Sequence, residues 1–411
     1  MPVELPTPQW DTTPPTLPRP FVWLGLFVAI MLAGVILALL TWPKGEPTDT
    51  AWFWMRLLAF PALAWCLLFG LRWLYHEQES ARLQAADDVL AADRAKALLF
   101  AREPLAVLNA SYLCAIGPGE AATQIVDGES KLESRDSFSD GTSVRHTALD
   151  VEGFNQEERF QSCFTALIRQ LATSLTEIPR RVPLAVYLQL PADAPHEQIF
   201  ALWQYCWDAA GYRSVETTLL HEEQGIMALD EWLDIRGGPE LEKIALFIAV
   251  QLHEMPSANS AEAAVALLLG WAPLVERKAL PSLALLHRPV EDSKDNVNET
   301  ISRALLWGNA EAANVEHLWQ AGLTHADASS LMQASSDLSL GLSSKQAADG
   351  IHDIDAAIGD AGVVAAWLAM ALAIEHVSQT HMPQLVASRQ NTLRATVVQP
   401  VATHQESGLQ G

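Results

Sequence analysis

The chain has 411 residues and a formal net charge of −23, with 26 lysines and arginines against 49 aspartates and glutamates. So large an acidic surplus disfavours nucleic acid as a partner, because phosphates would be repelled, and it disfavours a soluble domain lying flat on anionic lipid. The 4 cysteines form no CxxC pair and the 12 histidines no HExxH motif, so the sequence predicts no disulfide framework, metal site or cofactor.

Two long apolar runs follow a proline-rich start, residues 1–20, that is predicted to be disordered. Residues 21–42 carry no charged side chain, and as a helix they would extend about 33 Å, enough to cross a hydrocarbon core of roughly 30 Å. Residues 51–75 form the second run. A signal peptide fits less well, because its apolar region is shorter and ends in small residues. The two runs therefore predict a transmembrane hairpin over residues 21–75.

Basic residues near the ends of the two runs predict the orientation of this hairpin. Arg19 precedes the first run, and Arg72 and Arg82 lie at or beyond the end of the second. Since basic residues favour the cytoplasmic side, we expect both termini and the large domain in the cytoplasm. The predicted location is a bacterial inner membrane, crossed more than once.

The remaining chain alternates between strand-like and helix-like segments. Residues 76–102, charged and alanine-rich, predict a linker helix to a soluble domain over 103–400, and 401–411 predict a disordered tail. The predicted order of the first pass is strand 104–116, a long polar loop 117–150, helix 160–178, strand 183–190, helix 196–210, strand 214–220, helix 225–233, strand 244–252, and 262–269, which is strand or helix by composition. The second pass is strand 283–286, helix 297–307, an ambiguous stretch 309–345, a long helix 354–376, and short strands 385–387 and 393–398.

Two passes of one pattern predict an α/β fold made by internal duplication, with helices covering the sheets. The doubled βαβαβαββ order resembles the layout of the thiolase-like superfamily, which includes the ketosynthases. Residues 244–270, an apolar strand, a loop and EAAVALLL, are similar to the paired strands that close the first ketosynthase half. Residues 357–373, AIGDAGVVAAWLAMALA, are similar to the glycine turn and alanine-rich helix of the second half.

The resemblance also implies where catalytic residues would lie. A ketosynthase cysteine belongs at the turn before the third helix of the first half, where the helix dipole lowers the thiol pKa. The matching turn, 221–225, contains Gln224 and no cysteine, and Cys206 and Cys163 lie on earlier helices. Of two family histidines, one is replaced by Asp360 and the other has only a loose counterpart in His325. We therefore expect these three positions to be a degenerate site without a catalytic residue.

Other candidate sites have simpler interpretations. The spacing of Asp353, Asp355 and Asp360 allows a metal site, but it is more typical of carboxylates that cap a helix N-terminus. The pair Glu222 and Glu223 is typical of a solvated turn. His317 and His325 are read as ordinary surface or half-buried histidines.

Three functional hypotheses remain. The first is a non-catalytic, membrane-anchored scaffold or adaptor; catalytically degenerate thiolase-like proteins occur beside effector genes of type VI secretion systems, so the resemblance implies effector handling. Its partner would be a secreted effector or a second thiolase-like subunit, in a homo- or heterodimer. The second is a membrane-bound acyltransferase with altered catalytic residues. The third is a structural subunit that only packs against a homologous partner.

Overall fold

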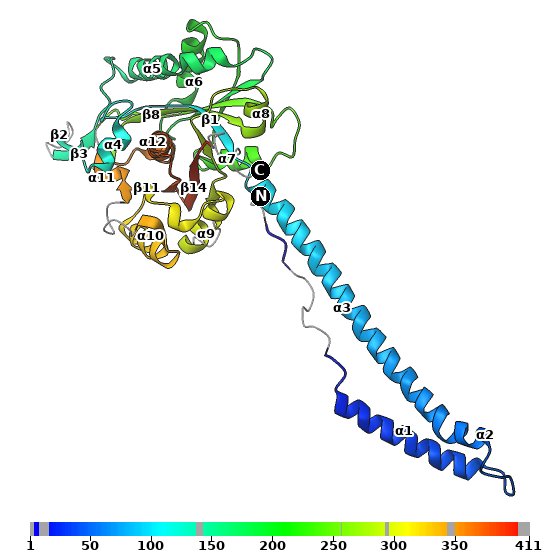
Figure 1. The fold of residues 1–411 in the computed structure, drawn as a ribbon. Helices are drawn as coiled ribbons and strands as arrows, with labels where there is room; N and C mark the ends of the chain where they lie inside the picture. Colours follow the sequence, from blue (N-terminus) through cyan, green and yellow to red (C-terminus); the bar gives the residue numbers. More distant parts are fainter. Residues whose placement is uncertain are drawn as a thin grey trace, which may run out of the picture. The chain divides into compact units, whose positions relative to one another are not determined.

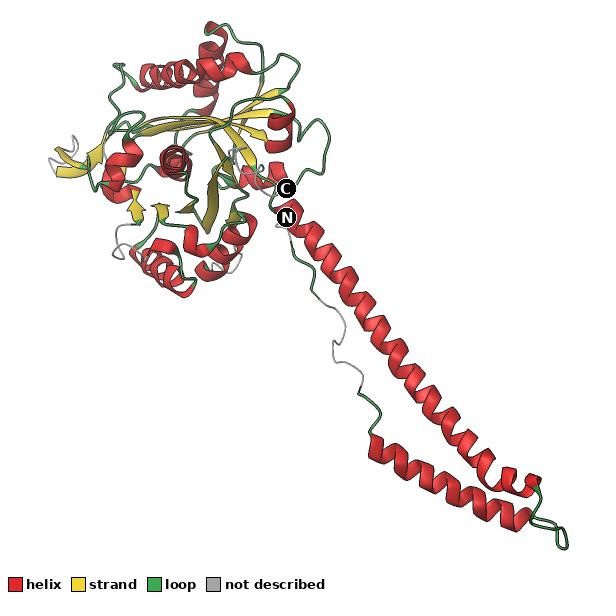
Figure 2. Ribbon diagram, in the orientation of Figure 1, coloured by secondary structure: helices red, strands yellow, loops and turns green. Residues whose placement is uncertain are grey.

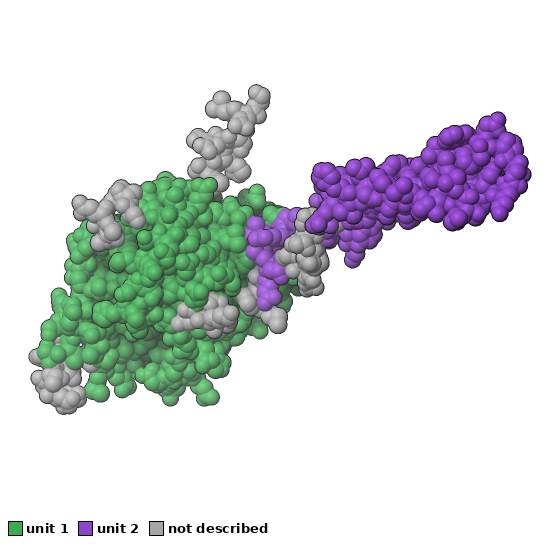
Figure 3. Space-filling view, turned by 90° about the horizontal axis from the view of Figure 1, so that it is seen from below, with its two compact units in different colours: residues 1–3, 99–411 green, residues 4–98 purple. Residues whose placement is uncertain are grey.

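The computed structural model describes residues 4–7, 16–136, 143–255, 257–291, 296–342 and 350–401. These residues form two compact units, residues 4–98 and the chain from Leu99 onward, which Figure 3 colours separately. Most of the predicted disordered start and all but the first residue of the predicted tail lie outside the described residues.

The first unit is a pair of long helices (Figure 1). Helix α1 covers Pro20–Thr41, and after a turn a continuous helical segment runs from Ala51 to Ala101. That segment consists of α2 (Ala51–Trp54), a wide π-helical turn η1 (Met55–Ala59) and α3 (Phe60–Ala101). The linker predicted over 76–102 is helical, and it continues the second apolar run within α3 because no helix-breaking residue lies between the two.

Pro61 explains the wide turn. Proline has no N–H to donate, and its ring would press on the carbonyl four residues earlier in a regular α-helix. In the turn just before it, the Phe60 N–H donates to the Met55 carbonyl, five residues back. Single wide turns of this kind are known inside α-helices, and here the turn lets the helix continue through the proline.

Close packing holds α1 against the second helix. A Cβ on Gly34 would lie 2.1 Å from Cγ of Pro61, so only glycine fits at this crossing. Further along, the Trp65 indole N–H donates to the Trp23 carbonyl at 3.0 Å, and the Phe27 and Trp65 rings meet edge-on with centroids 5.2 Å apart. The hairpin is therefore a specific helix pair.

Replacing Gly34 with leucine is expected to separate the two helices, because the new side chain would overlap Pro61. A disulfide between cysteines introduced at Phe27 and Trp65 reports the distance, and we expect its yield to fall several-fold in Gly34→Leu. Gly25→Leu is the matched control, since a Cβ at Gly25 meets no atom within 4 Å. Equal yields in both variants would contradict this packing.

The second unit is built on an 11-stranded mixed sheet with helices on both sides, and it also contains a small three-stranded sheet (Figure 2). Its first pass consists of β1 (Leu105–Leu113), α4 (Ala121–Val126), β2 (Glu133–Asp136), β3 (Ser143–Thr147), α5 (Gln156–Glu177), β4 (Leu184–Gln189), α6 (His196–Ala209), β5 (Glu216–Leu219), α7 (Met227–Leu233), β6 (Ile244–Gln251), β7 (Ser260–Ala261) and β8 (Ala263–Trp271). After α8 (Ala272–Arg277), the second pass consists of β9 (Ala284–Leu286), β10 (Val290–Glu291), α9 (Val297–Trp307), η2 (Ala312–Asn314), β11 (His317–Ala321), α10 (His325–Asp337), β12 (Ile351–Asp353), α11 (Ile354–Ile358), η4 (Gly362–Val364), α12 (Ala365–Thr380), β13 (Gln384–Arg389) and β14 (Leu393–Pro400).

The strand order demonstrates the duplication. In the first pass the neighbours run β5-β4-β6-β8-β1, and in the second β12-β11-β13-β14-β9. When β2, β3, β7 and β10, which lie off this path, are left out and the remaining five strands of each pass are numbered in chain order, both orders are third, second, fourth, fifth, first. In both passes the fifth strand is antiparallel to its neighbours, and β1 and β9 pair antiparallel to join the two halves. The predicted duplicated βαβαβαββ domain is confirmed.

Helix α12 lies in the core between the strands of the two halves (Figure 1). Among the described residues, three helical segments are long and apolar enough to cross a membrane: Pro20–Thr41, Ala51–Ala101 and Gly362–Thr380. The third is 78% buried inside the sheet domain, against 6% for each of the other two. Its apolar character therefore serves the core.

Two segments differ from the sequence predictions. The loop predicted over 117–150 contains α4 and the hairpin of β2 and β3, because β3 gains a parallel partner in β7, more than a hundred residues away. The helix predicted over 354–376 is interrupted at Gly359, which has a φ of 101°. A Cβ there would lie 2.6 Å from the Ser260 carbonyl oxygen, so a close strand approach breaks the helix.

Candidate functional site

Gln224 lies in the turn between β5 and α7, as the sequence predicts. Its side chain donates to the carboxylate of Glu231, which lies on α7 seven residues further along the chain. Gly225 follows with a φ of 48°, a left-handed conformation that suits glycine. Helix α7 has only seven residues.

Residues from the β13–β14 connection and from the start of β14 fill the space in front of this turn. The Arg394 guanidinium donates to the Glu223 carbonyl at 2.6 Å and to the Gln224 carbonyl at 3.1 Å. A Cβ on Gly225 would lie 2.2 Å from the Gln390 side-chain oxygen and 2.9 Å from Arg394. Arg394 is itself 5% exposed. Two polar side chains, Gln390 and Arg394, therefore pack against the turn at which the resemblance would place a nucleophile.

The three cysteines of the sheet domain are free and buried. Cys163 on α5 is fully buried, and burial raises the pKa of its thiol to about 12. Burial also raises the pKa of Cys206 on α6 and of Cys114 after β1. Because the thiolate is the reactive form, all three are poor nucleophiles near neutral pH.

The three aspartates at and beyond the end of β12 do not form a metal site. Asp353 caps α11 by accepting from the Ala356 N–H at 3.0 Å, which confirms the capping prediction for that residue. Asp360 is exposed, and its carboxylate accepts from the Gly362 N–H at 2.8 Å, just before α12. No group of three histidine, cysteine or acidic residues within the described ranges has the geometry to hold a metal ion.

Asp355 differs from its two neighbours because it is directed into the protein. One carboxylate oxygen accepts from the Gly322 N–H at 2.7 Å, and the other is buried without a hydrogen-bond partner. Burial, followed by the charges of Asp360 and Asp353, raises the pKa of Asp355 to about 7. This carboxyl group therefore titrates near neutral pH, a property that capping alone did not predict.

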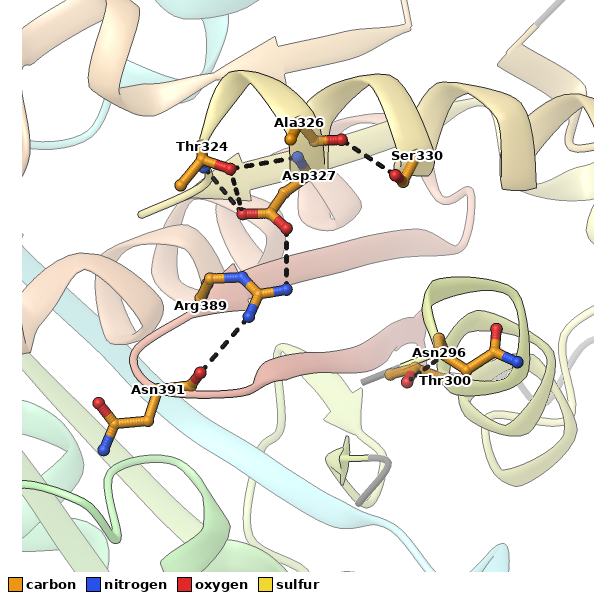
Figure 4. Close-up of polar contacts among 8 residues, drawn as sticks. All are labelled: Asn296, Thr300, Thr324, Ala326, Asp327, Ser330, Arg389 and Asn391. Carbon is orange, nitrogen blue, oxygen red and sulfur yellow. Dashed lines mark hydrogen bonds and ion pairs between the residues drawn. The ribbon is translucent and has the colours of Figure 1, made fainter. Parts of the chain in front are cut away.

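His325 is the first residue of α10 and is exposed. The start of that helix is fixed by a capping box between Thr324 and Asp327 (Figure 4). Asp327 also accepts from Arg389 at 2.8 Å, so α10 is tied to the end of β13. This network uses the residues on either side of His325, and the imidazole takes no part in it.

The three predicted positions are not assembled into one site. Gln224 contacts Arg394 and Glu231, Asp360 contacts the start of α12, and His325 faces solvent. No hydrogen bond, ion pair or ring contact joins any two of them in the described part of the chain. The geometry required for acyl transfer, with a nucleophile close to its proton donors, is therefore not formed by these residues.

Sequence reasoning missed a cluster of three histidines, one each from β11, β12 and α12. His317 Nδ1 and His352 Nε2 are 2.8 Å apart, and the His317 and His376 rings meet edge-on with centroids 4.4 Å apart. Burial, followed by the neighbouring histidines, lowers the pKa of His352 to about 3 and that of His376 to about 4. In the sequence, the spacing of His317 and Trp319 places both side chains on one face of the same strand, but it does not indicate that His352 and His376 join them.

Comparison with known proteins identifies the class of fold. No protein-family model matches the sequence, and no curated protein matches it. Among solved structures, the sheet domain is similar to the ketosynthase from module 1 of the bacillaene synthase of Bacillus amyloliquefaciens FZB42, with 13% identity and a TM-score of 0.51 over 74% of this chain and 77% of that one. The protein therefore contains a domain with the thiolase-like, ketosynthase-type fold.

Two further structures are paired assemblies by their descriptions. The ishigamide ketosynthase/chain length factor shares 13% identity and a TM-score of 0.52 over 73% of this chain and 100% of that one. The complex AntDE:AntF, an acyl-carrier protein with its ketosynthase, gives 14% identity and a TM-score of 0.51 over 73% and 100%. At these identities the likeness extends to the fold alone.

Proposed function

We propose that this protein is a membrane-anchored scaffold whose ketosynthase-like domain has lost condensing activity and binds a protein partner. The observation that carries the proposal is the filled turn at Gln224. Arg394 and Gln390 occupy the space in which a substrate would approach a nucleophile, and no thiol lies there.

The hairpin supports the anchoring role. Its two helices leave large apolar side chains exposed over most of their length, such as Leu40 at 79% and Leu67 at 66%, an arrangement suited to lipid. With the basic residues counted above, the hairpin would cross a bacterial inner membrane and hold the sheet domain in the cytoplasm. Labelling cysteines introduced at Lys44 and at Arg82 with a membrane-impermeant maleimide tests this orientation. Labelling at Lys44 alone from the periplasmic side is expected, and the reverse pattern would refute it.

The partner is proposed to be a protein, either a second thiolase-like subunit or a secreted effector of a type VI system. Two structurally similar proteins are described as a ketosynthase with a chain length factor and as a ketosynthase with an acyl-carrier protein, which supports pairing with a further protein. The test is recovery of co-purified proteins from membranes with the full chain and with a variant lacking residues 21–75. Unchanged recovery from membranes without the hairpin would overturn the tethering role.

The reactivity of the cysteines distinguishes the scaffold from the alternative, an acyltransferase. Since burial raises the thiol pKa of Cys114, Cys163 and Cys206, we expect none to react with iodoacetamide at pH 7.5 until the domain unfolds. Intact-mass spectrometry before and after denaturation measures this. Rapid modification of Cys206 in the folded chain, or a labelled acyl adduct lost in Cys206→Ala, would favour the enzyme instead.

A further inference from the structure

The two halves of the sheet leave part of one strand edge open. Strand β1 runs to Leu113, but β9 pairs only with its first three residues, Leu105–Val107. The pairing of β1 with β8 continues along its whole length, with an irregularity between Val107 and Asn109. From residue 108 to 113 the edge that faces away from β8 therefore has no strand partner in the described chain.

A cavity of about 370 Å³ lies along this open edge. It is lined by β1, by the loop that follows it, and by side chains of α5 and α12, among them Ser111, Tyr112, Gly119, Gln170, Leu283 and Glu375. The Tyr112 hydroxyl accepts from the Gly119 N–H at 3.1 Å and from the Ala121 N–H at 3.3 Å, which fixes the loop as a wall. We call the open edge and this cavity the β1 notch.

The β1 notch contains one carboxylate oxygen that lacks a donor. The Tyr112 hydroxyl donates to Oε2 of Glu375, whereas Oε1 is buried and has no hydrogen-bond partner. Leaving a buried acceptor unsatisfied costs free energy, and more so for a charged group. Burial raises the pKa of Glu375, whereas hydrogen bonds from the Tyr112 hydroxyl and the Ala122 N–H lower it and the charge of Glu120 raises it. A cation beside this carboxylate would offset the cost of its burial.

We propose that the β1 notch binds an extended, basic segment of a partner protein, which adds a strand to the open edge of β1 and directs a lysine or arginine side chain to Glu375. Unpaired strand edges are satisfied by other strands, and main-chain hydrogen bonds then supply affinity while pockets select side chains. The cavity has the volume of a few side chains. The net charge of −23 favours a basic partner. The inference rests on the proposed scaffold role and specifies the chemistry of its partner.

The test uses the purified full chain in detergent micelles and two pools of capped nonapeptides. One pool has lysine fixed at the central position and the other glutamate, with randomised flanking residues, and binding is read by affinity selection and mass spectrometry. We expect enrichment from the lysine pool only.

The best peptide should bind roughly tenfold more weakly to Glu375→Gln, because a charge-assisted hydrogen bond is lost. Gln170→Arg, at the exposed rim, should weaken binding by repulsion. Glu197→Gln makes the same charge change at an exposed residue of α6 and should leave the affinity for the peptide unchanged.

Several results would overturn the proposal. These are no enrichment from either pool, equal enrichment from both, or equal affinity for the wild-type chain, Glu375→Gln and Gln170→Arg when all three keep the same melting temperature. If a backbone N-methylated peptide binds with the same affinity as the unmodified peptide, strand addition is excluded. If equimolar n-butylammonium displaces the peptide completely, the cavity is a site for small amines and not for a strand. Because the assay needs neither membrane nor natural partner, its failure alongside normal partner recovery would leave the scaffold role standing.

Discussion

Lowering the pH from 7 to 5 is expected to weaken the sheet domain by about 3 kcal/mol. Burial lowers the pKa of His287 and His376 to about 4 and of His352 to about 3, from an ordinary value of 6.5. Between pH 6.5 and 4 the unfolded chain therefore binds protons at these sites and the folded chain does not. Stability is full above pH 6.5 and is lost as the pH falls, at about 2 kcal/mol for each histidine over this range.

Asp355 opposes this effect. Its pKa is raised to about 7 from 3.8, so the folded state binds a proton that the unfolded state releases between pH 3.8 and 7. Its contribution is fully present below pH 3.8 and falls as the pH rises, which returns about 2 kcal/mol on going from pH 7 to 5. The three histidines outweigh it.

Hydrogen exchange of the buried β6 amides measures this loss of stability between pH 7 and 5 in the full chain, because exchange at these amides requires unfolding of the core. His376→Leu should reduce the pH dependence by more than half, because this histidine supplies about 2 of the net 3 kcal/mol. Asp355→Asn should increase the pH dependence. His221→Gln, on an exposed turn, is the control and should change nothing. Equal protection at pH 7 and 5 would show that the histidines are not buried as described.

Truncating Glu262 to alanine is expected to destabilise the sheet domain by about 3 to 5 kcal/mol. This carboxylate is 1% exposed and accepts from both Arg159 guanidinium nitrogens, from the Leu149 N–H at 2.9 Å and from the His253 N–H at 3.0 Å. Its loss would leave a half-buried guanidinium and two backbone donors without partners. The substitution would also loosen the contact that joins α5 and the segment before it to the connection between β6 and β8.

Chemical denaturation of wild type, Glu262→Ala and Glu262→Gln measures this effect. Glutamine keeps the shape and one acceptor, so its cost should lie between the other two. Glu240→Ala is the matched control, because its ion pair with Lys243 leaves the glutamate side chain 75% exposed and such pairs contribute less than about 1 kcal/mol. A loss for Glu262→Ala as small as that of the control would contradict the buried network.

Much of the fold could be predicted from local patterns. The periodic apolar residues of α9 predicted its bounds correctly, the run at β4 predicted a strand, and the uniform apolar run at β6 predicted a buried strand. Such segments are readable because their side chains repeat with the period of the element itself. By contrast, 262–269 was ambiguous because a short apolar run suits either structure, and its position between β1 and β6 made it a strand.

The candidate site could be predicted only in part. Position 224 and the absence of a cysteine there were readable from the sequence. That Arg394, 170 residues away, fills the space in front of the turn was not. In the same way, Asp353 was recognisable as a cap, whereas the raised pKa of Asp355 depends on Gly322 and on burial.

The sequence by itself determined what depends on neighbours along the chain: two apolar helices at the start, an acidic soluble domain, and the order of strands and helices in two passes. The tertiary structure alone decided the closed turn at Gln224, the helix break at Gly359, the histidine cluster and the open edge of β1. The reason is physical, because each of these arises from contacts between segments far apart in sequence. Neither hydrophobic periodicity nor residue spacing carries information about which distant segments meet.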